Sequence, residues 1–249
     1  MRYEANYIRN KVLEDGYFLY RNYYKEDEII NFRNELEYKI KNSPIYYSRI
    51  NNKSIKDYSE FRSHDDVQRT LRHYMYFHNS SSWNKEIKKI IGNSINLRDE
   101  IEEDWLKDHN HKKITEKYQN YIILTKYFSG VGKLNFHRDI EIETDFPLLQ
   151  FNILLSSHGK DYENGEFILK DKNNKNIAIH KDLDANIGDA LIFDKYLLHA
   201  VETTEKGYTD IGRWSILIGA RAKYMSFFDS YLKKSKFFHF YKNIKRRIK

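Results

Sequence analysis

The chain has 249 residues, of which 40% are hydrophobic and 16% aromatic, so it holds enough apolar side chains for a folded core. It has no cysteine, which excludes disulfide scaffolds, thiolate zinc sites and cysteine nucleophiles and fits a reducing compartment. The N-terminal residues are charged throughout, and no apolar run approaches the ~20 residues that span a bilayer. We therefore expect a cytoplasmic globular protein without a signal peptide.

The basic charge is concentrated at the C-terminal end. Residues 223–249 carry nine basic side chains and one acidic side chain, a net charge of +8, whereas the whole chain carries +7. Residues 1–222 are therefore close to neutral at −1. Charge thus gives no reason to expect nucleic-acid binding by the body of the protein.

In residues 224–249, aromatic and apolar residues recur at helical steps of three, four or seven among lysines and arginines. Such a helix suits an anionic membrane surface, which predicts a peripheral position on the inner membrane face. Two alternatives stay open: the helix packs its aromatic side chains on the domain, or the segment is a nucleic-acid arm, which the lack of a base-reading module disfavours. The residues of this face are Phe228, Tyr231, Phe238, Tyr241, Ile244 and Ile248.

Residues 1–117 are predicted to be mainly helical. Residues 25–40 place apolar side chains at helical spacing and begin with acidic residues, which suit the helix dipole. A short strand is expected within residues 15–24 and a second long helix over 82–108. Residues 43–66 are polar and turn-rich, which predicts a loop.

From residue 118 to 222 the pattern changes to short apolar runs separated by Gly, Asn, Asp and Ser, with no helical pattern between them for crossover helices. Residues 118–222 are therefore predicted to form an all-β sandwich or barrel rather than a doubly wound parallel sheet. With the helices of the N-terminal half, the whole protein is predicted to be α+β with a mainly β core. We treat residues 1–222 as one domain and 223–249 as a tail. The predicted strands lie within residues 121–128, 134–142, 148–156, 165–171, 176–183, 189–194, 198–203 and 213–221.

Two of these strands carry a candidate metal site. Side chains two apart on a strand share a face, so His137 and Asp139 are expected to point the same way. A histidine and a carboxylate in this arrangement suit a two-histidine-one-carboxylate triad for Fe(II), and His199 is the best-placed third ligand. His180 is a weaker competitor for that third position, and His64 with Asp66 is better explained as a solvated pair in a polar loop.

The last predicted strand carries a candidate carboxylate site. Arg213 and Ser215 share a face, and an arginine with a hydroxyl beside it can bind a carboxylate through charge-assisted hydrogen bonds. 2-Oxoglutarate has the right shape, because its 2-oxo acid end can chelate a metal while its other carboxylate reaches the arginine. Tyr127 and Asn152 lie on strands expected to line the barrel, where contact with the co-substrate and hydrogen bonding within the core explain them equally well.

The chain resembles the Fe(II)/2-oxoglutarate-dependent dioxygenases, and residues 15–36 are similar to the phytanoyl-CoA-hydroxylase-like branch. The family pattern is a His-x-Asp, a distal histidine before a small apolar strand, and an Arg-x-Ser about a dozen residues later. A protein-kinase reading of His-Arg-Asp is set aside, because Thr144 stands where a kinase has asparagine and no DFG follows. The motifs that carry the resemblance are His137-Arg138-Asp139, 164–167, 188–194, His199-Ala200-Val201 and Arg213-Trp214-Ser215.

The resemblance implies a double-stranded β-helix, a jelly-roll or cupin-like barrel, that binds Fe(II), 2-oxoglutarate and O2. It also implies hydroxylation of an unactivated C–H bond with release of succinate and CO2. Together with the tail, it favours a small-molecule or lipid-linked substrate, such as the sugar of a glycolipid. The competing hypothesis is a non-catalytic jelly-roll protein that binds a membrane surface or a carbohydrate. The sequence does not indicate an oligomeric state.

Overall fold

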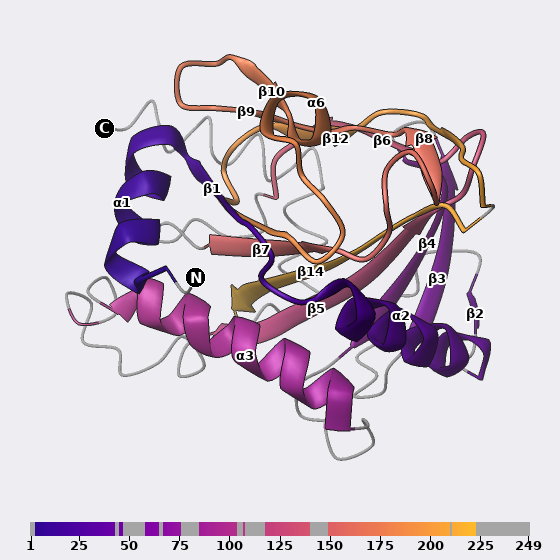
Figure 1. The fold of residues 1–249 in the computed structure, drawn as a ribbon, viewed down its shortest axis with the longest axis horizontal. Helices are drawn as coiled ribbons and strands as arrows, with labels where there is room; N and C mark the ends of the chain where they lie inside the picture. Colours follow the sequence, from indigo (N-terminus) through magenta and orange to yellow (C-terminus); the bar gives the residue numbers. More distant parts are fainter. Residues whose placement is uncertain are drawn as a thin grey trace, which may run out of the picture.

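The computed structural model shows a large, mainly antiparallel β-sheet that folds over on itself, with three helices packed on one face (Figure 1). The structure describes residues 3–42, 45–46, 58–64, 67–75, 85–103, 107, 118–139, 149–209 and 211–222. The predictions for the C-terminal tail lie outside the described residues.

The elements follow in chain order. The helices are α1 (Ala5–Asp15), α2 (Glu26–Lys41), α3 (Lys85–Ile101) and α6 (Ile179–Leu183). The strands are β1 (Tyr17–Tyr20), β2 (Ile45–Tyr46), β3 (Tyr58–His64), β4 (Val67–Met75), β5 (Tyr118–Tyr127), β6 (Lys133–His137), β7 (Leu149–Leu154), β8 (Tyr162–Asn164), β9 (Phe167–Lys170), β10 (Asn176–Ala178), β11 (Ala190–Asp194), β12 (His199–Val201), β13 (Thr204–Lys206) and β14 (Arg213–Ala222).

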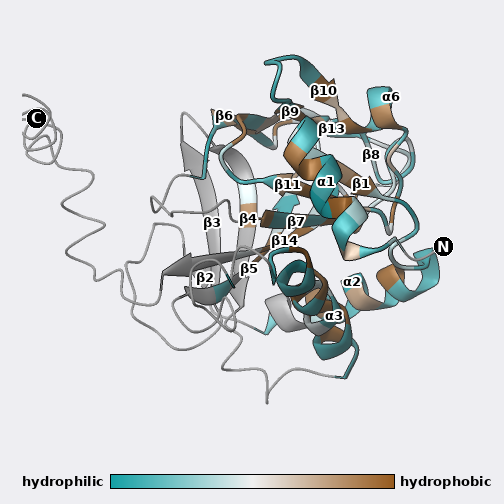
Figure 2. Cartoon of the chain, turned by 90° about the vertical axis from the view of Figure 1, so that its left-hand side faces the viewer, coloured by the Kyte–Doolittle hydropathy of each residue, from teal (hydrophilic) through white to brown (hydrophobic). Residues whose placement is uncertain are grey.

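The main sheet has the order β1-β11-β7-β14-β5-β4-β6-β12-β9-β10, with β3 paired beside β4 and β2 beside β3. Strand β4 pairs with both β5 and β6, so the sheet turns its corner there. In Figures 1 and 2 the β6-β12-β9-β10 end lies over the β11-β7-β14-β5 part, opposite the helices. Strands β8 and β13 form a separate two-stranded ribbon. Two facing antiparallel layers are the predicted jelly-roll arrangement.

Side chains along the central strands alternate between the apolar core under the helices and the cavity between the two layers. On β14, Trp214 and Ile216 belong to the apolar core under the helices, while Arg213, Ser215 and Leu217 line the cavity between the two layers. Because successive side chains of a strand point to opposite faces, this one strand supplies both environments. The same division holds on β7, where Phe151 is in the core and Asn152 faces the cavity.

The helices cover the outer face of the central strands. Acidic residues crowd the first turn of α2, as the sequence predicted, and Ile29, Phe32 and Leu36 follow at helical spacing with no exposed surface. In Figure 2 the helices carry both hydrophobic (brown) and hydrophilic (teal) residues, as expected of helices that pack on a sheet with one face. The loop before α2 packs closely against Gly188. A Cβ atom at this position would lie 2.3 Å from the carbonyl oxygen of Tyr24, and the φ of +87° also favours glycine.

The structure confirms the strand within residues 15–24 and the two long helices, and it corrects three local expectations. Residues 58–64, predicted as part of a loop, form β3, which pairs with β4 next to the barrel. Pairing with neighbouring strands outweighs their polar composition. The second half of 176–183 is α6 rather than strand. Strand β6 ends at His137, so Asp139 lies beyond the strand that was expected to carry it. The proposed boundary between domain and tail stays a prediction.

Candidate metal and co-substrate site

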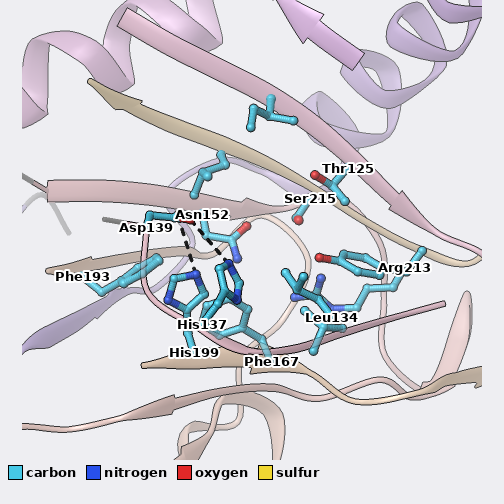
Figure 3. Close-up of a pocket in the computed structure, with 14 residues that line it drawn as sticks. Thr125, Leu134, His137, Asp139, Asn152, Phe167, Phe193, His199, Arg213 and Ser215 are labelled. Atoms are coloured by element: carbon cyan, nitrogen blue, oxygen red, sulfur yellow. Dashed lines mark ion pairs between the residues drawn. The ribbon is translucent and has the colours of Figure 1, made fainter. Parts of the chain in front are cut away.

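Three side chains from the overlying layer converge at the mouth of the barrel (Figure 3). Strands β6 and β12 pair so that His199 lies directly opposite His137, and the two imidazole centroids are 4.3 Å apart. Asp139 follows β6 and places Oδ1 3.4 Å from His137 Nε2 and Oδ2 3.7 Å from His199 Nε2. The three candidate ligand atoms lie within 4.8 Å of one another. One metal ion can therefore contact all three.

Both imidazoles are oriented by the backbone. His137 Nδ1 is 3.0 Å from the carbonyl oxygen of Asn135, and His199 Nδ1 is 3.0 Å from that of Leu197. A carbonyl only accepts, so Nδ1 carries the proton in each ring and Nε2 presents its lone pair towards Asp139. This is the arrangement in which a neutral histidine binds a metal through Nε2 while its other nitrogen is held by a hydrogen bond.

Asp139 is held in its ionised form. Desolvation by the surrounding residues acts to raise the pKa of Asp139. When no metal is bound and the rings take a second proton on Nε2, the contact with His137 and the charges of both imidazoles outweigh it, together with a hydrogen bond from Gln150, and hold the pKa well below its usual range. Gln150 Nε2 donates to Asp139 Oδ2 at 2.8 Å. From the sequence, Gln150 is expected only on a strand that lines the barrel, two residues before Asn152 and on the same face of β7, and its contact with Asp139 is not predicted.

Arg213 is the cation at the other end of the cavity. It is 1% exposed, and its guanidinium lies 5.4 Å from the ring centre of Tyr127 and 5.8 Å from that of Phe167. Its Nε and Nη2 have no hydrogen-bond partner within the described part of the chain. Two adjacent N–H groups of an arginine match the two oxygens of a carboxylate, and leaving a buried charge unpaired is costly. The observation therefore favours an anionic ligand at this position.

All seven residues singled out from the sequence line one cavity: Tyr127, His137, Asp139, Asn152, His199, Arg213 and Ser215. The Oδ1 atom of Asn152 is also buried without a partner in the described structure. The sequence did not single out Leu134, Phe167 and Phe193, which form apolar walls next to the imidazoles (Figure 3). Their strand positions were predicted, but an apolar residue on a strand gives no signal that separates a cavity wall from the core.

His180, the weaker candidate for the third ligand, lies elsewhere. It belongs to α6, where its ring contacts Glu166 and Tyr162. Among the described residues, the only group of three with metal-ligand geometry is that of His137, Asp139 and His199. The side chains of His64 and Asp66 lie outside the described residues.

The fold is similar to that of several solved oxygenases. A prolyl-4-hydroxylase from Pseudomonas putida superposes with a TM-score of 0.61 at 9% identity, covering 88% of this chain and 99% of that one. A prolyl hydroxylase from Trichoplax adhaerens gives 0.54 at 13% identity, with 88% and 89% covered. A 2OG-Fe(II) oxygenase-family oxidoreductase from Burkholderia pseudomallei gives 0.53 at 11% identity, with 88% and 92% covered. The predicted double-stranded β-helix is thereby confirmed.

The barrel and the cavity it encloses define an Fe(II)- and 2-oxoglutarate-dependent oxygenase, an enzyme that takes Fe(II), 2-oxoglutarate and O2. The chain belongs to the Oxygenase-NA family, whose profile matches residues 58–208 and which is described as an oxygenase catalysing oxidative methylation of damaged DNA. No curated protein matches the chain. The resemblance to the phytanoyl-CoA-hydroxylase-like branch stays a prediction. None of the described helices is long and apolar enough to cross a membrane.

Proposed function

We propose that this oxygenase hydroxylates a C–H bond of its substrate, with His137, Asp139 and His199 holding Fe(II). The observation that carries the proposal is the convergence of three ligand atoms within 4.8 Å beside an arginine with unpartnered N–H groups. Two imidazoles and one carboxylate occupy one face of an octahedral ion and leave the adjacent positions for a chelating co-substrate and oxygen.

Arg213 and Ser215 bind the distal carboxylate of 2-oxoglutarate in this proposal. They lie next to each other on one face of β14, and Arg213 offers Nε and Nη2 as donors. Asn152 and Tyr127 line the same cavity as Arg213 and the metal ligands, so in this proposal they contact the co-substrate. Because these residues are buried, few waters compete for the carboxylate, and each charge-assisted hydrogen bond is stronger than it is in water.

When bound, Fe(II) supplies the oxidation of a C–H bond by O2, coupled to decarboxylation of 2-oxoglutarate, so that one oxygen atom enters succinate and the other the new hydroxyl group. The protein contributes orientation and shielding. Gln150 and the two carbonyls of Asn135 and Leu197 hold the ligands in place, and the rings of Phe167 and Phe193 cover His199. Without these contacts, the three ligands lose the geometry that one ion requires.

Two substrate classes follow from different observations. The basic, aromatic tail at 224–249 supports a small-molecule or lipid-linked substrate at an anionic membrane surface, with the enzyme in the cytoplasm. The family description supports a base in damaged DNA. For an N-methylated base, hydroxylation of the methyl carbon gives an unstable N-hydroxymethyl group, which breaks down to formaldehyde and the N–H of the unmethylated base. The near-neutral charge of residues 1–222 leads us to place the lipid-linked class first.

The enzyme class is tested without knowledge of the substrate. Anaerobic addition of Fe(II) and 2-oxoglutarate should give the visible charge-transfer band of the chelate, and air should then produce succinate slowly. His137→Ala and Asp139→Ala should abolish both signals, while Asp15→Ala, a surface control outside the site, should keep them. A wild-type protein that gives neither band nor succinate would refute the proposal in favour of a non-catalytic jelly-roll protein.

The substrate class is tested by succinate release above this uncoupled rate. The panel contains lipid-linked sugars in anionic vesicles, the corresponding free sugars, and an oligonucleotide with N-methylated bases. Stimulation by the vesicle-bound lipid supports the favoured class, and its loss after deletion of residues 224–249 supports the role of the tail. Stimulation by the oligonucleotide alone, with release of formaldehyde, would replace the lipid-linked proposal with DNA.

A further inference from the structure

A chain of hydrogen bonds outside the metal site ends beside Arg213. His180 Nε2 is 3.0 Å from the hydroxyl of Tyr162, and His180 Nδ1 is 3.0 Å from Glu166 Oε2. The same carboxylate oxygen accepts the backbone N–H of His180 at 3.1 Å. All three side chains are shielded, with Tyr162 1% exposed and the side chains of His180 and Glu166 6% and 13% exposed. None of them was assigned a role in the site.

The backbone brings this chain to the arginine. The N–H of Gly212, one residue before Arg213, donates to the carbonyl of Asp161, one residue before Tyr162, at 3.0 Å. The end of the chain formed by Tyr162 therefore lies next to the start of β14. Burial raises the pKa of Tyr162 to about 12, and the nearby positive charge of Arg213 acts to lower it, which agrees with this neighbourhood.

The carboxylate fixes the direction of the hydrogen bonds. Glu166 only accepts, so His180 carries its proton on Nδ1 and offers the Nε2 lone pair to Tyr162. The Tyr162 hydroxyl then donates to Nε2, and its oxygen keeps a lone pair that can accept from a neighbouring donor. Burial, reinforced by Arg213 and His158 and opposed by Glu166, lowers the pKa of His180, which keeps the ring neutral near pH 7.

We propose that Tyr162 is a positioning residue for Arg213, and that Glu166 and His180 fix the direction of its hydroxyl so that Arg213 presents Nε and Nη2 to the co-substrate. Arginine has four torsions that must be frozen to bind a carboxylate with two N–H groups, and a fixed acceptor on one side lowers that cost before the ligand arrives. The inference rests on the proposed role of Arg213 and extends it to residues that touch no ligand.

The first test compares binding and turnover of 2-oxoglutarate. Tyr162→Phe keeps the ring and removes the acceptor, so it should raise the Kd for 2-oxoglutarate about tenfold in calorimetric titration of the Zn(II)-loaded protein. The KM in uncoupled turnover should rise by a similar factor with kcat nearly unchanged. Tyr208→Phe, at a tyrosine that is 92% exposed, is the matched control and should leave both constants unchanged.

A second pair of variants guards against simple misfolding. His180→Gln retains an acceptor close to the position of Nε2 and should keep the Kd within about threefold, whereas His180→Leu fills the space without an acceptor and should match Tyr162→Phe. Glu166→Gln should weaken binding, while Glu163→Gln on the exposed side of β8 should not. Nitrogen-15 NMR of the imidazole should show the neutral tautomer protonated on Nδ1 at pH 7.5.

The outcomes separate this inference from the proposed function. If Arg213→Ala weakens binding of 2-oxoglutarate but Tyr162→Phe and His180→Leu do not, the positioning role is refuted and the role of Arg213 stands. If Arg213→Ala leaves the Kd unchanged, the co-substrate assignment itself fails. Equal losses in His180→Gln and His180→Leu, or an Nε2-protonated tautomer, would also refute the hydrogen-bond chain.

Discussion

Glu102, just after the end of α3, should make the stability of this protein fall as the pH rises. Its side chain has no exposed surface; Oε1 accepts the N–H of Leu149 at 2.6 Å, and Oε2 has no hydrogen-bond partner within the described residues. Burial raises the pKa of Glu102 from 4.5 to about 8, although Arg98, 4.0 Å away, and the N–H of Leu149 act to lower it. The folded protein therefore keeps a proton that the unfolded chain has released.

The sign and size of the effect follow from linkage. A raised carboxyl pKa contributes stability that is fully present below pH 4.5 and is lost as the pH rises through about 8. At ~1.4 kcal/mol for each pH unit between the two values, the free energy of unfolding should fall by ~4 kcal/mol between pH 5 and pH 9 because of this one group. In Glu102→Gln the amide keeps the acceptor for Leu149 and carries no titrating proton, so this contribution should vanish.

Urea denaturation at unit steps from pH 5 to pH 9 measures the difference. The free energies of the wild type and of Glu102→Gln should diverge with rising pH, the variant becoming relatively more stable by ~3–4 kcal/mol at pH 9. Glu103→Gln is the matched control, because the Glu103 side chain is 59% exposed and pairs with Lys107 at 2.7 Å. If the wild type and Glu102→Gln run parallel across the range, Glu102 is ionised in the folded protein and the reasoning is wrong.

Three further changes test other contacts. Gln150→Leu removes the donor to Asp139 and should weaken Fe(II) binding by about tenfold with little loss of fold, measured by metal titration; unchanged affinity would contradict the orienting role. Arg33→Met leaves the buried carboxylate of Asp161 without its cation at 2.9 Å and should cost ~3 kcal/mol in urea unfolding, whereas a cost below ~1 kcal/mol would mean that the remaining hydrogen bonds suffice. Gly188→Ala puts a Cβ atom 2.3 Å from a carbonyl oxygen at a φ of +87° and should cost more than ~2 kcal/mol; a thermal midpoint like that of the wild type would refute the strain argument.

Strand alternation made the site predictable to a large extent. Because β14 lies between β5 and β7 in the central sheet, the residues two apart on these strands face one cavity, and Arg213 is paired directly with Tyr127. The site residues predicted on these strands therefore lie in the same cavity. Strand alternation was also used to place Asp139 on the same strand face as His137, and this was wrong. Strand β6 ends at His137, so Asp139 lies in the loop that follows the strand.

The rest depended on long-range contacts that local patterns do not encode. Strands β3 and β4 are polar, and their pairing, of β3 with β4 and of β4 with β5, makes them strands. The sequence placed His180 within a predicted strand, but its partners Tyr162, on β8, and Glu166, just before β9, lie elsewhere in the chain, so no spacing rule connects them. Gln150 had a detectable signal, the shared face with Asn152, yet its partner Asp139 lies in a segment without regular structure.

The histidine metal ligands and the residues proposed to bind the co-substrate carboxylate lie on different layers of the barrel. His137 and His199 belong to β6 and β12, while Arg213 and Ser215 belong to β14 in the opposite layer. The hydrogen bond from Gln150 on β7 to Asp139 crosses between them at 2.8 Å. A co-substrate held at the metal and at Arg213 would add a second bridge that exists only in the folded protein. Binding should therefore stabilise the two layers as one unit, with a gain that grows with the logarithm of the 2-oxoglutarate concentration only when the metal is also present.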